Sequence, residues 1–295
     1  MKLLASILFF FFSLLGYAQQ SIIKKSYVKY KDYKTMKGNK DMYLDSIGFK
    51  IINNDSLVEI TAMDIKGSVS VPYEYKDSLF LKEYKKLVYN KDNQKLKAIV
   101  GKQPMMRYWK SEIKVYFDST VSNENRRELT RFFKYIDKEV DSLNIAVVNN
   151  KSKSNYFIYC VNKPDDINWE QRISSQTGGY YVSWDGKQRL FNCTLKLDTQ
   201  KIYNSKQQLI ALKKDFLFSL GNFYAIKDRD CKSYFSTCFS LDKELTADDL
   251  ELLKYHYSYG ICKGTDLETF ENNHKNAQEE LQKNPKHRME FLHRE

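Results

Sequence analysis

Gly179-Tyr-Tyr-Val-Ser-Trp184 and Leu190-Phe-Asn-Cys-Thr-Leu-Lys-Leu197 are two runs rich in strand-forming residues, and Asp185-Gly186 lies between them. Aromatic and β-branched residues are typical of strands because they pack well on a pleated surface. An Asp-Gly pair is typical of a two-residue hairpin turn, in which both turn residues take a positive φ. We therefore expect an antiparallel hairpin over residues 179–197.

A helix is expected directly after this hairpin, from about Lys206 to Leu220. Ser205 precedes it, and Gly221 follows at a position that suits a C-cap. Its apolar residues recur at helical spacing and predict one buried face. They are Leu209, Leu212, Phe216, Leu217 and Leu220.

The flanking sequence predicts further strands and helices in alternation. Before the hairpin, strands are expected at 113–117 and 156–161, with a helix from Ser122 or Asn123 to about Ser142 between them. After it, Thr246-Ala-Asp-Asp is an N-terminal capping pattern for a helix that reaches Tyr257. The order of elements favours an α+β fold with a mixed sheet.

Residues 1–18 have the features of a cleavable secretory signal peptide. Lys2 is positive, residues 3–15 are apolar, and Gly16 and Ala18 are small residues before the expected cleavage site. The apolar run is shorter than the roughly 20 residues that span a bilayer. We therefore expect an exported protein, periplasmic or extracellular, with no transmembrane segment.

The remaining chain is expected to form three parts. Residues 19–105 contain short strand-like runs, such as 48–52, 57–61, 68–71 and 96–100, and predict a small β-rich unit. Residues 106–264 hold the strands and helices of the main α+β domain. Residues 265–295 are highly charged and predict a peripheral helical tail.

The composition narrows the range of partners. The chain has 48 Lys and Arg against 37 Asp and Glu, a formal net charge of +11, with a 42% hydrophobic share that excludes a wholly disordered chain. The Lys residues are spread along the sequence, which predicts a solvated, Lys-rich surface. A second interpretation is that this basic surface attracts an anionic polymer. Nucleic acid is the least expected partner, because the chain is Arg-poor and carries an export signal.

Cysteine and histidine contents limit metal chemistry. The five cysteines form no zinc-ribbon spacing, and their pairing stays open, although Cys231 and Cys238 are close enough to close a small loop. The others, Cys160, Cys193 and Cys262, are candidates for free thiols. The four histidines show no metal-ligand spacing, and His256 is expected to be structural. No cofactor is expected.

The stretch from Tyr108-Trp109 to about Gly264 resembles a family of exported bacterial proteins of unknown function that is itself similar to zincin metallopeptidases. Four pieces carry the resemblance: Tyr108-Trp-Lys110 before the first strand, Gly179-Tyr-Tyr-Val-Ser-Trp184, Leu212-Lys-Lys-Asp-Phe-Leu-Phe-Ser-Leu-Gly221 and Leu245-Thr-Ala-Asp-Asp-Leu-Glu-Leu-Leu-Lys-Tyr255. The resemblance implies a zincin-like mixed sheet that packs on a helix of the active-site type.

Zinc peptidases place His-Glu-x-x-His on that helix, so that two histidines bind one ion and the glutamate activates its water. Aligning the downstream glycine of the motif on Gly221 puts Lys214 and Phe218 at the histidine positions and Tyr224 at the third ligand position. Asp215 takes the position of the general base. Neither a protonated lysine nor a phenylalanine binds zinc, so the resemblance implies the scaffold without the metal chemistry.

Three functional hypotheses follow. The first is a secreted non-catalytic protein that binds an extended peptide along Tyr180, Tyr181, Val182, Ser183 and Trp184 by strand addition. The second is a hydrolase with a relocated, non-standard site that uses Asp215. The third is a protein that binds an anionic cell-surface polymer through its basic charge.

Overall fold

The structure is a computed structural model that describes residues 25–29, 46–52, 55–61, 68–90, 104–283 and 290–294. The expected signal peptide and the expected strand at 96–100 lie outside these residues. The chain divides into two compact units, residues 1–69 with 294–295 and residues 70–293. The division lies after Val69, whereas the sequence suggests a boundary near residue 105.

The smaller unit contains a three-stranded antiparallel sheet with the order β1-β3-β2. Its strands are β1 Lys25–Lys29, β2 Ser46–Ile52 and β3 Asp55–Thr61. The strands expected at 48–52 and 57–61 are confirmed.

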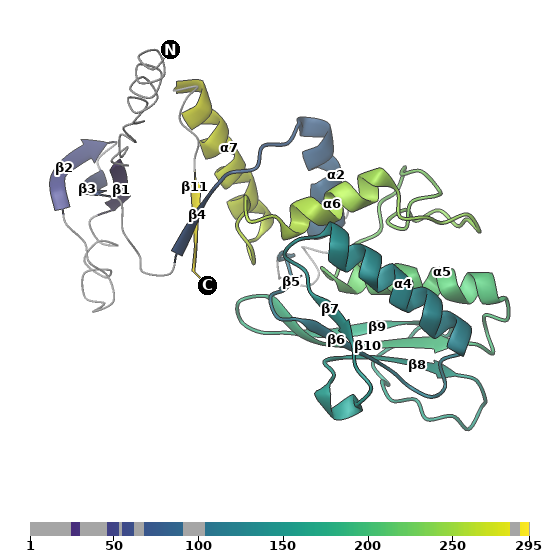
Figure 1. Ribbon diagram of the computed structural model, residues 1–295. Coiled ribbons are helices and arrows are strands. Elements are labelled where there is room, and N and C mark those ends of the chain that lie inside the picture. Colours follow the sequence, from purple (N-terminus) through teal and green to yellow (C-terminus); the bar gives the residue numbers. More distant parts are fainter. Residues whose placement is uncertain are drawn as a thin grey trace, which may run out of the picture. The chain divides into compact units, whose positions relative to one another are not determined.

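The larger unit alternates strands and helices (Figure 1). Its strands are β5 Tyr108–Trp109, β6 Ile113–Phe117, β7 Ile145–Val147, β8 Tyr156–Val161, β9 Gly178–Trp184 and β10 Arg189–Asp198. Its helices are α2 Ser78–Tyr89, α4 Asn123–Glu139, the short 3-10 helix η1 Lys151–Lys153, α5 Ser205–Ser219, α6 Ala247–Tyr257 and α7 Leu267–Lys283. Two further strands, β4 Ser68–Pro72 and β11 Glu290–Arg294, pair with each other.

The main sheet is mixed, as expected. Its strand order is β5-β10-β8-β6-β7, and β9 pairs with β10. These five ordered strands are parallel where they pair, whereas β9 runs antiparallel to β10. The chain is therefore an α/β protein in which the predicted hairpin supplies both a central strand and an antiparallel strand at the edge.

Helices α4 and α5 lie side by side over one face of the main sheet (Figure 1). The side chains between them and the sheet are aromatic and fully buried. The Phe216 ring of α5 lies 4.2 Å from the Phe133 ring of α4 and 5.4 Å from the Tyr156 ring of β8, measured between centroids. This packing fixes α5 above the strands β8 and β10, with its C-terminal end near the edge strand.

Helix boundaries follow the expected capping residues, with two differences. Ser122 and Thr246 cap α4 and α6 as expected, but Asn204 caps α5, which begins at Ser205. Gly221 is not the left-handed residue after α5. Asn222 takes that conformation, with φ 51°, and the Phe223 amide donates to the Phe218 carbonyl at 2.9 Å, as in a Schellman motif.

The hairpin turn also differs from the expected two-residue type. Gln188 takes the positive φ of 61°, and the Gln188 amide donates to the Asp185 carbonyl at 3.0 Å. The Asp185 carboxylate accepts from the backbone amides of Lys187 and Arg189. This is a three-residue loop that ends on a left-handed residue, which Asp185 stabilises from inside the turn.

Helix α2 was not expected from the sequence. Asp77 caps it by accepting from the amides of Leu79 and Phe80 at 2.8 and 2.9 Å. Tyr84 and Leu87 are fully buried in the core of the larger unit. The segment therefore belongs to the main core rather than to a β-rich N-terminal unit.

Candidate functional site

The edge strand β9 pairs with β10 alone among the described strands, so its second edge is free of backbone partners there. Its register places Tyr180 opposite Leu195, Val182 opposite Cys193 and Trp184 opposite Leu190. Gly178 opens the strand with φ 132°, and a Cβ there would lie 2.4 Å from the Lys196 carbonyl oxygen. A glycine is therefore required where β9 joins the sheet.

Alternate side chains of β9 face opposite sides of the sheet. Tyr180 faces the helices, because its hydroxyl lies 3.3 Å from Asn222 Oδ1 just after α5. Val182 is buried, and Trp184 is 41% exposed at the end of the strand. Tyr181 lies on the other face, where the guanidinium of Arg172 lies 3.8 Å from its ring. All five residues predicted for peptide binding therefore lie on one edge strand beside the end of α5.

The positions that the resemblance aligns with zinc ligands, Lys214, Phe218 and Tyr224, do not form a polar ligand set. Phe218 is 7% exposed, and its ring packs 5.7 Å from the ring of Phe235. Lys214 Nζ lies 5.5 Å from the Phe218 ring centroid. Tyr224 lies apart from this apolar contact, and its amide donates to the Leu87 carbonyl at 2.8 Å. The position that the resemblance aligns with the second histidine is therefore occupied by a buried aromatic contact.

No cluster of three or more His, Cys, Asp or Glu side chains suited to a metal ion occurs in the part of the chain that the structure describes. His256 is fully buried, with Nε2 2.8 Å from the Arg107 carbonyl and Nδ1 3.2 Å from the Tyr84 hydroxyl. Burial lowers its pKa to about 3, so the ring is neutral at physiological pH. His256 is a structural residue that holds the backbone before β5.

Asp215 has the environment of a perturbed acid. Burial raises the pKa of its carboxyl from 3.8 to about 7, although the charge of Lys214 acts in the opposite direction. The side chain keeps some contact with solvent. Tyr180 is close enough for the Asp215 charge to raise the pKa of its hydroxyl further, after the larger effect of burial. The structure therefore brings the candidate acid and the first aromatic residue of the edge strand together.

Arg107 completes this group, although no motif or spacing in the sequence indicates it. Its guanidinium stacks 3.9 Å above the Trp184 ring, and its side chain forms a hydrogen bond with Tyr224. Burial lowers the pKa of Arg107. Its Nε is buried without a hydrogen-bond partner among the described residues. We call Arg107, Tyr180, Trp184, Asp215 and Tyr224 the edge cluster.

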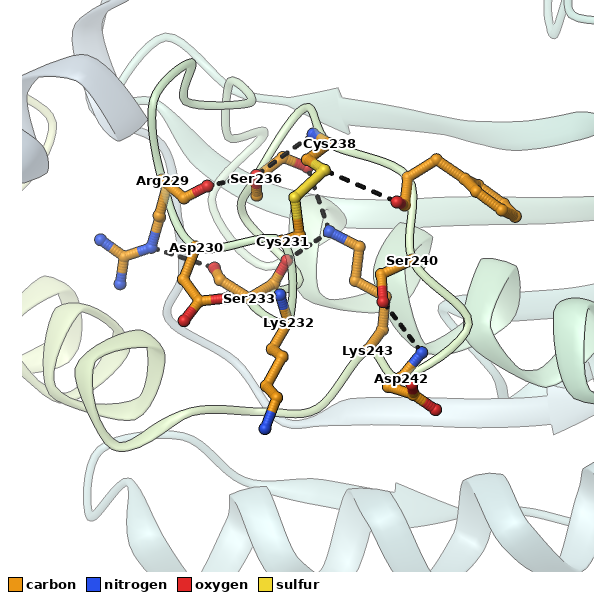
Figure 2. The surroundings of a disulfide bond; sticks show 11 residues. Arg229, Asp230, Cys231, Lys232, Ser233, Ser236, Cys238, Ser240, Asp242 and Lys243 are labelled. Atoms are coloured by element: carbon orange, nitrogen blue, oxygen red, sulfur yellow. Dashed lines mark hydrogen bonds between the residues drawn. A yellow bond between two sulfur atoms is a disulfide. The ribbon is translucent and has the colours of Figure 1, made fainter.

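The loop after α5 is stabilised by a disulfide and by hydrogen bonds. Cys231 and Cys238 form a disulfide, which settles the pairing that the sequence left open. Figure 2 shows Lys243 beside this disulfide, where its Nζ donates to the Ser233 carbonyl at 2.6 Å. Cys160 and Cys193 are buried free thiols, and burial raises the pKa of each to about 12.

Asp249 fixes this loop to α6 and was not singled out in the sequence. Its fully buried carboxylate accepts from Arg229 Nη2 at 2.9 Å, from the Ser233 hydroxyl at 2.6 Å and from the Tyr234 amide at 3.0 Å. The same loop carries Phe235, which packs on Phe218. Asp249 therefore supports the loop that packs Phe235 against Phe218.

Comparison with known proteins adds no relative: no protein-family model matches the chain, and no curated protein matches it. Within the described residues, the helices are all too short or too polar to cross a bilayer.

Proposed function

We propose that this chain is an exported, non-catalytic peptide-binding protein on a degenerate zincin-like scaffold. The observation that carries the proposal is the free edge of β9 beside the C-terminal end of α5. In active zincins the strand that flanks the cleft pairs with extended substrate. An edge strand offers a row of backbone donors and acceptors, and a peptide in extended conformation satisfies them by adding a strand.

Two features support the zincin-like reading of the scaffold. The chain order β6, α4, β8, β9, β10 and α5 is the expected order, and the short strand β7 is added to it before β8. The strand before β10 is antiparallel and lies at the edge.

The substitution of the metal positions supports the non-catalytic part. Lys214 and Phe218 stand where ligands are needed, and the Phe218 ring is packed against Phe235. An exported location agrees with the signal-like residues 1–18 and with the disulfide between Cys231 and Cys238.

Peptide addition is tested with fluorescein-labelled octapeptides of alternating Thr and Val, measured by fluorescence polarisation. Two further peptides carry N-methyl groups on the odd or on the even residues. Because N–H groups of an extended strand alternate in direction, strand addition predicts that one methylated peptide binds as the parent does and the other does not. Equal binding of both methylated peptides, or no binding of the parent, contradicts the proposal.

A matched pair of protein variants locates the binding strand. Trp184 on β9 and Trp169 on the loop before it are exposed to similar extents, 41% and 49%. We expect Trp184→Ala to weaken peptide binding about tenfold, as truncation of an interface tryptophan commonly does, and Trp169→Ala to leave it unchanged. The reverse result would place the site on the loop.

A second candidate is a hydrolase that uses Asp215 without the standard metal site. Its support is the raised pKa of Asp215, because a general acid or base works best with a pKa near the ambient pH. A pool of fluorogenic peptide and ester substrates, with Asp215→Asn as the matched variant, tests it. Turnover that is lost in Asp215→Asn would favour the enzyme over the binding protein. Stoichiometric zinc in the purified chain would favour a metal-dependent enzyme.

A further inference from the structure

Two arginines stack on aromatic side chains of β9 from opposite faces of the sheet. Arg172 lies 3.8 Å from the Tyr181 ring, and Arg107 lies 3.9 Å from the Trp184 ring. Arg172 is paired with a carboxylate, because its Nε and Nη2 each lie 2.7 Å from an oxygen of Glu170. Arg107 forms no ion pair with any carboxylate among the described residues.

The unpaired guanidinium is the more buried of the two. Arg172 is exposed, whereas Arg107 is half-buried and its Nε is shielded from solvent without an acceptor. Shielding a charged group without a counter-charge is unfavourable, and buried charges in proteins are normally paired. Arg107 carries this unfavourable burial at the end of the free edge strand β9. An unpaired, partly buried charge beside a free edge is typical of a group that receives its counter-charge from a ligand.

The described residues that stack on Arg107 or shift its pKa are aromatic rather than acidic. Tyr224 and Tyr180 both lie close enough to Arg107 to shift its pKa, and burial keeps the pKa of Tyr180 well above its ordinary value. The Arg107 guanidinium carbon lies 3.9 Å from the centroid of the Trp184 ring. The charge of Asp215 raises the pKa of Tyr180, but Asp215 is not among the residues that shift the pKa of Arg107.

We propose that Arg107 binds a carboxylate of the peptide that pairs with β9, which makes acidic peptides the preferred ligands. This proposal rests on the proposed peptide binding and adds the chemistry of the ligand to it. A guanidinium matches a carboxylate through two parallel N–H donors. The formal net charge of +11 favours approach of an acidic partner. The carboxylate is supplied by an acidic side chain or by the peptide C-terminus.

The test uses the full chain and three labelled octapeptides of alternating Thr and Val, measured by fluorescence polarisation at 150 mM salt. One is C-terminally amidated with a central Glu, one is amidated with Gln in its place, and one has the Gln with a free C-terminus. We expect at least one carboxylate peptide to bind about tenfold or more tightly than the amidated Gln peptide, as for hydrogen bonds to charged groups. The peptide that gains identifies the source of the carboxylate.

Arg107→Gln is expected to abolish this preference, so that the three peptides bind with similar affinity. Arg107→Lys should retain only part of the preference, because an ammonium cannot form the bidentate contact. Arg172→Gln is the matched control, since it removes a stacked arginine from the other face of the same strand and should leave the preference unchanged. Thermal unfolding of each variant, followed by circular dichroism, shows whether it is folded.

The outcomes separate the two proposals. Equal binding of all three peptides, or a preference that survives in folded Arg107→Gln, overturns the carboxylate site while peptide binding stands. Failure of all three peptides to bind overturns both. Loss of the preference in Arg172→Gln rather than in Arg107→Gln would assign the site to the opposite face of β9.

Discussion

Replacing Asp215 by Asn is expected to stabilise the protein at neutral and alkaline pH but not at pH 4. Burial raises the pKa of Asp215 in the folded chain from 3.8 to about 7. Between these values the folded chain holds a proton that the unfolded chain has lost. Stability therefore falls as the pH rises through this range and levels off above about pH 7.

The magnitude follows from the same two values. A difference of about 3 in pKa, at about 1.36 kcal/mol for each pH unit, sets an upper bound of roughly 4 kcal/mol on the penalty. Asp215 keeps some contact with solvent, which reduces the cost of its charge. We therefore expect Asp215→Asn to gain roughly 2–4 kcal/mol in the free energy of unfolding at pH 8 relative to pH 4.

The assay is urea unfolding of the wild-type protein and Asp215→Asn in parallel from pH 4 to pH 8. The difference between the two curves isolates Asp215, because other titrating groups cancel. Asp165→Asn, in an exposed loop, controls for the general loss of a carboxylate. A difference that stays constant within about 0.5 kcal/mol over this range would refute the reasoning, because a normally titrating carboxyl produces no such slope.

Three further predictions concern contacts that stabilise the larger unit. Asp249→Ala should destabilise the protein by about 3–5 kcal/mol in urea unfolding, since it leaves the largely buried Arg229 with the longer ion pair to Glu83, at 3.4 Å, and removes the acceptor of the Ser233 hydroxyl and the Tyr234 amide. Asp248→Ala, in the exposed first turn of the same helix, should cost less than about 1 kcal/mol. Equal effects of the two substitutions would contradict the role of Asp249. Replacing both Cys231 and Cys238 by Ser should lower the free energy of unfolding by about 2.5 kcal/mol, because the disulfide closes a short loop with a sequence separation of 7. A change under about 0.5 kcal/mol would mean that other contacts hold the loop without the disulfide. His256 should show no titration of its ring NMR signals between pH 8 and pH 5, because burial lowers its pKa to about 3. Its contribution to stability weakens only as the pH falls below about 6.5, because the histidine of the unfolded chain takes up a proton there. A titration midpoint near 6.5 would contradict its burial.

Periodic and capped segments of the larger unit could be predicted from the sequence. The apolar stripe of α5, the Ser122 and Thr246 caps and the paired runs at 179–197 each combine several local preferences that agree. Helix α2 was missed although Asp77 offers a cap and Leu81, Tyr84 and Leu87 recur at a spacing of three. Its signal was read as part of a region with strand-like runs.

Details that depend on packing could not be predicted. Gly221 offers the conformational freedom of a C-cap, yet Asn222 takes the left-handed position; a Cβ at 221 would lie 2.1 Å from the Phe223 ring, so the glycine is needed for space. Arg107 is one of nine arginines in the sequence and carries no motif. Only the folded chain shows that it stacks on Trp184 without a carboxylate partner.

The central claim is that β9 accepts an extended peptide along its free edge. Hydrogen exchange measured by mass spectrometry, with and without saturating amidated Glu octapeptide, tests it most directly. We expect slower exchange in a fragment that covers residues 178–184, because new backbone hydrogen bonds protect its outward-facing amides. Exchange in α4 should change little. Peptide binding that leaves exchange in 178–184 unchanged would contradict the central claim.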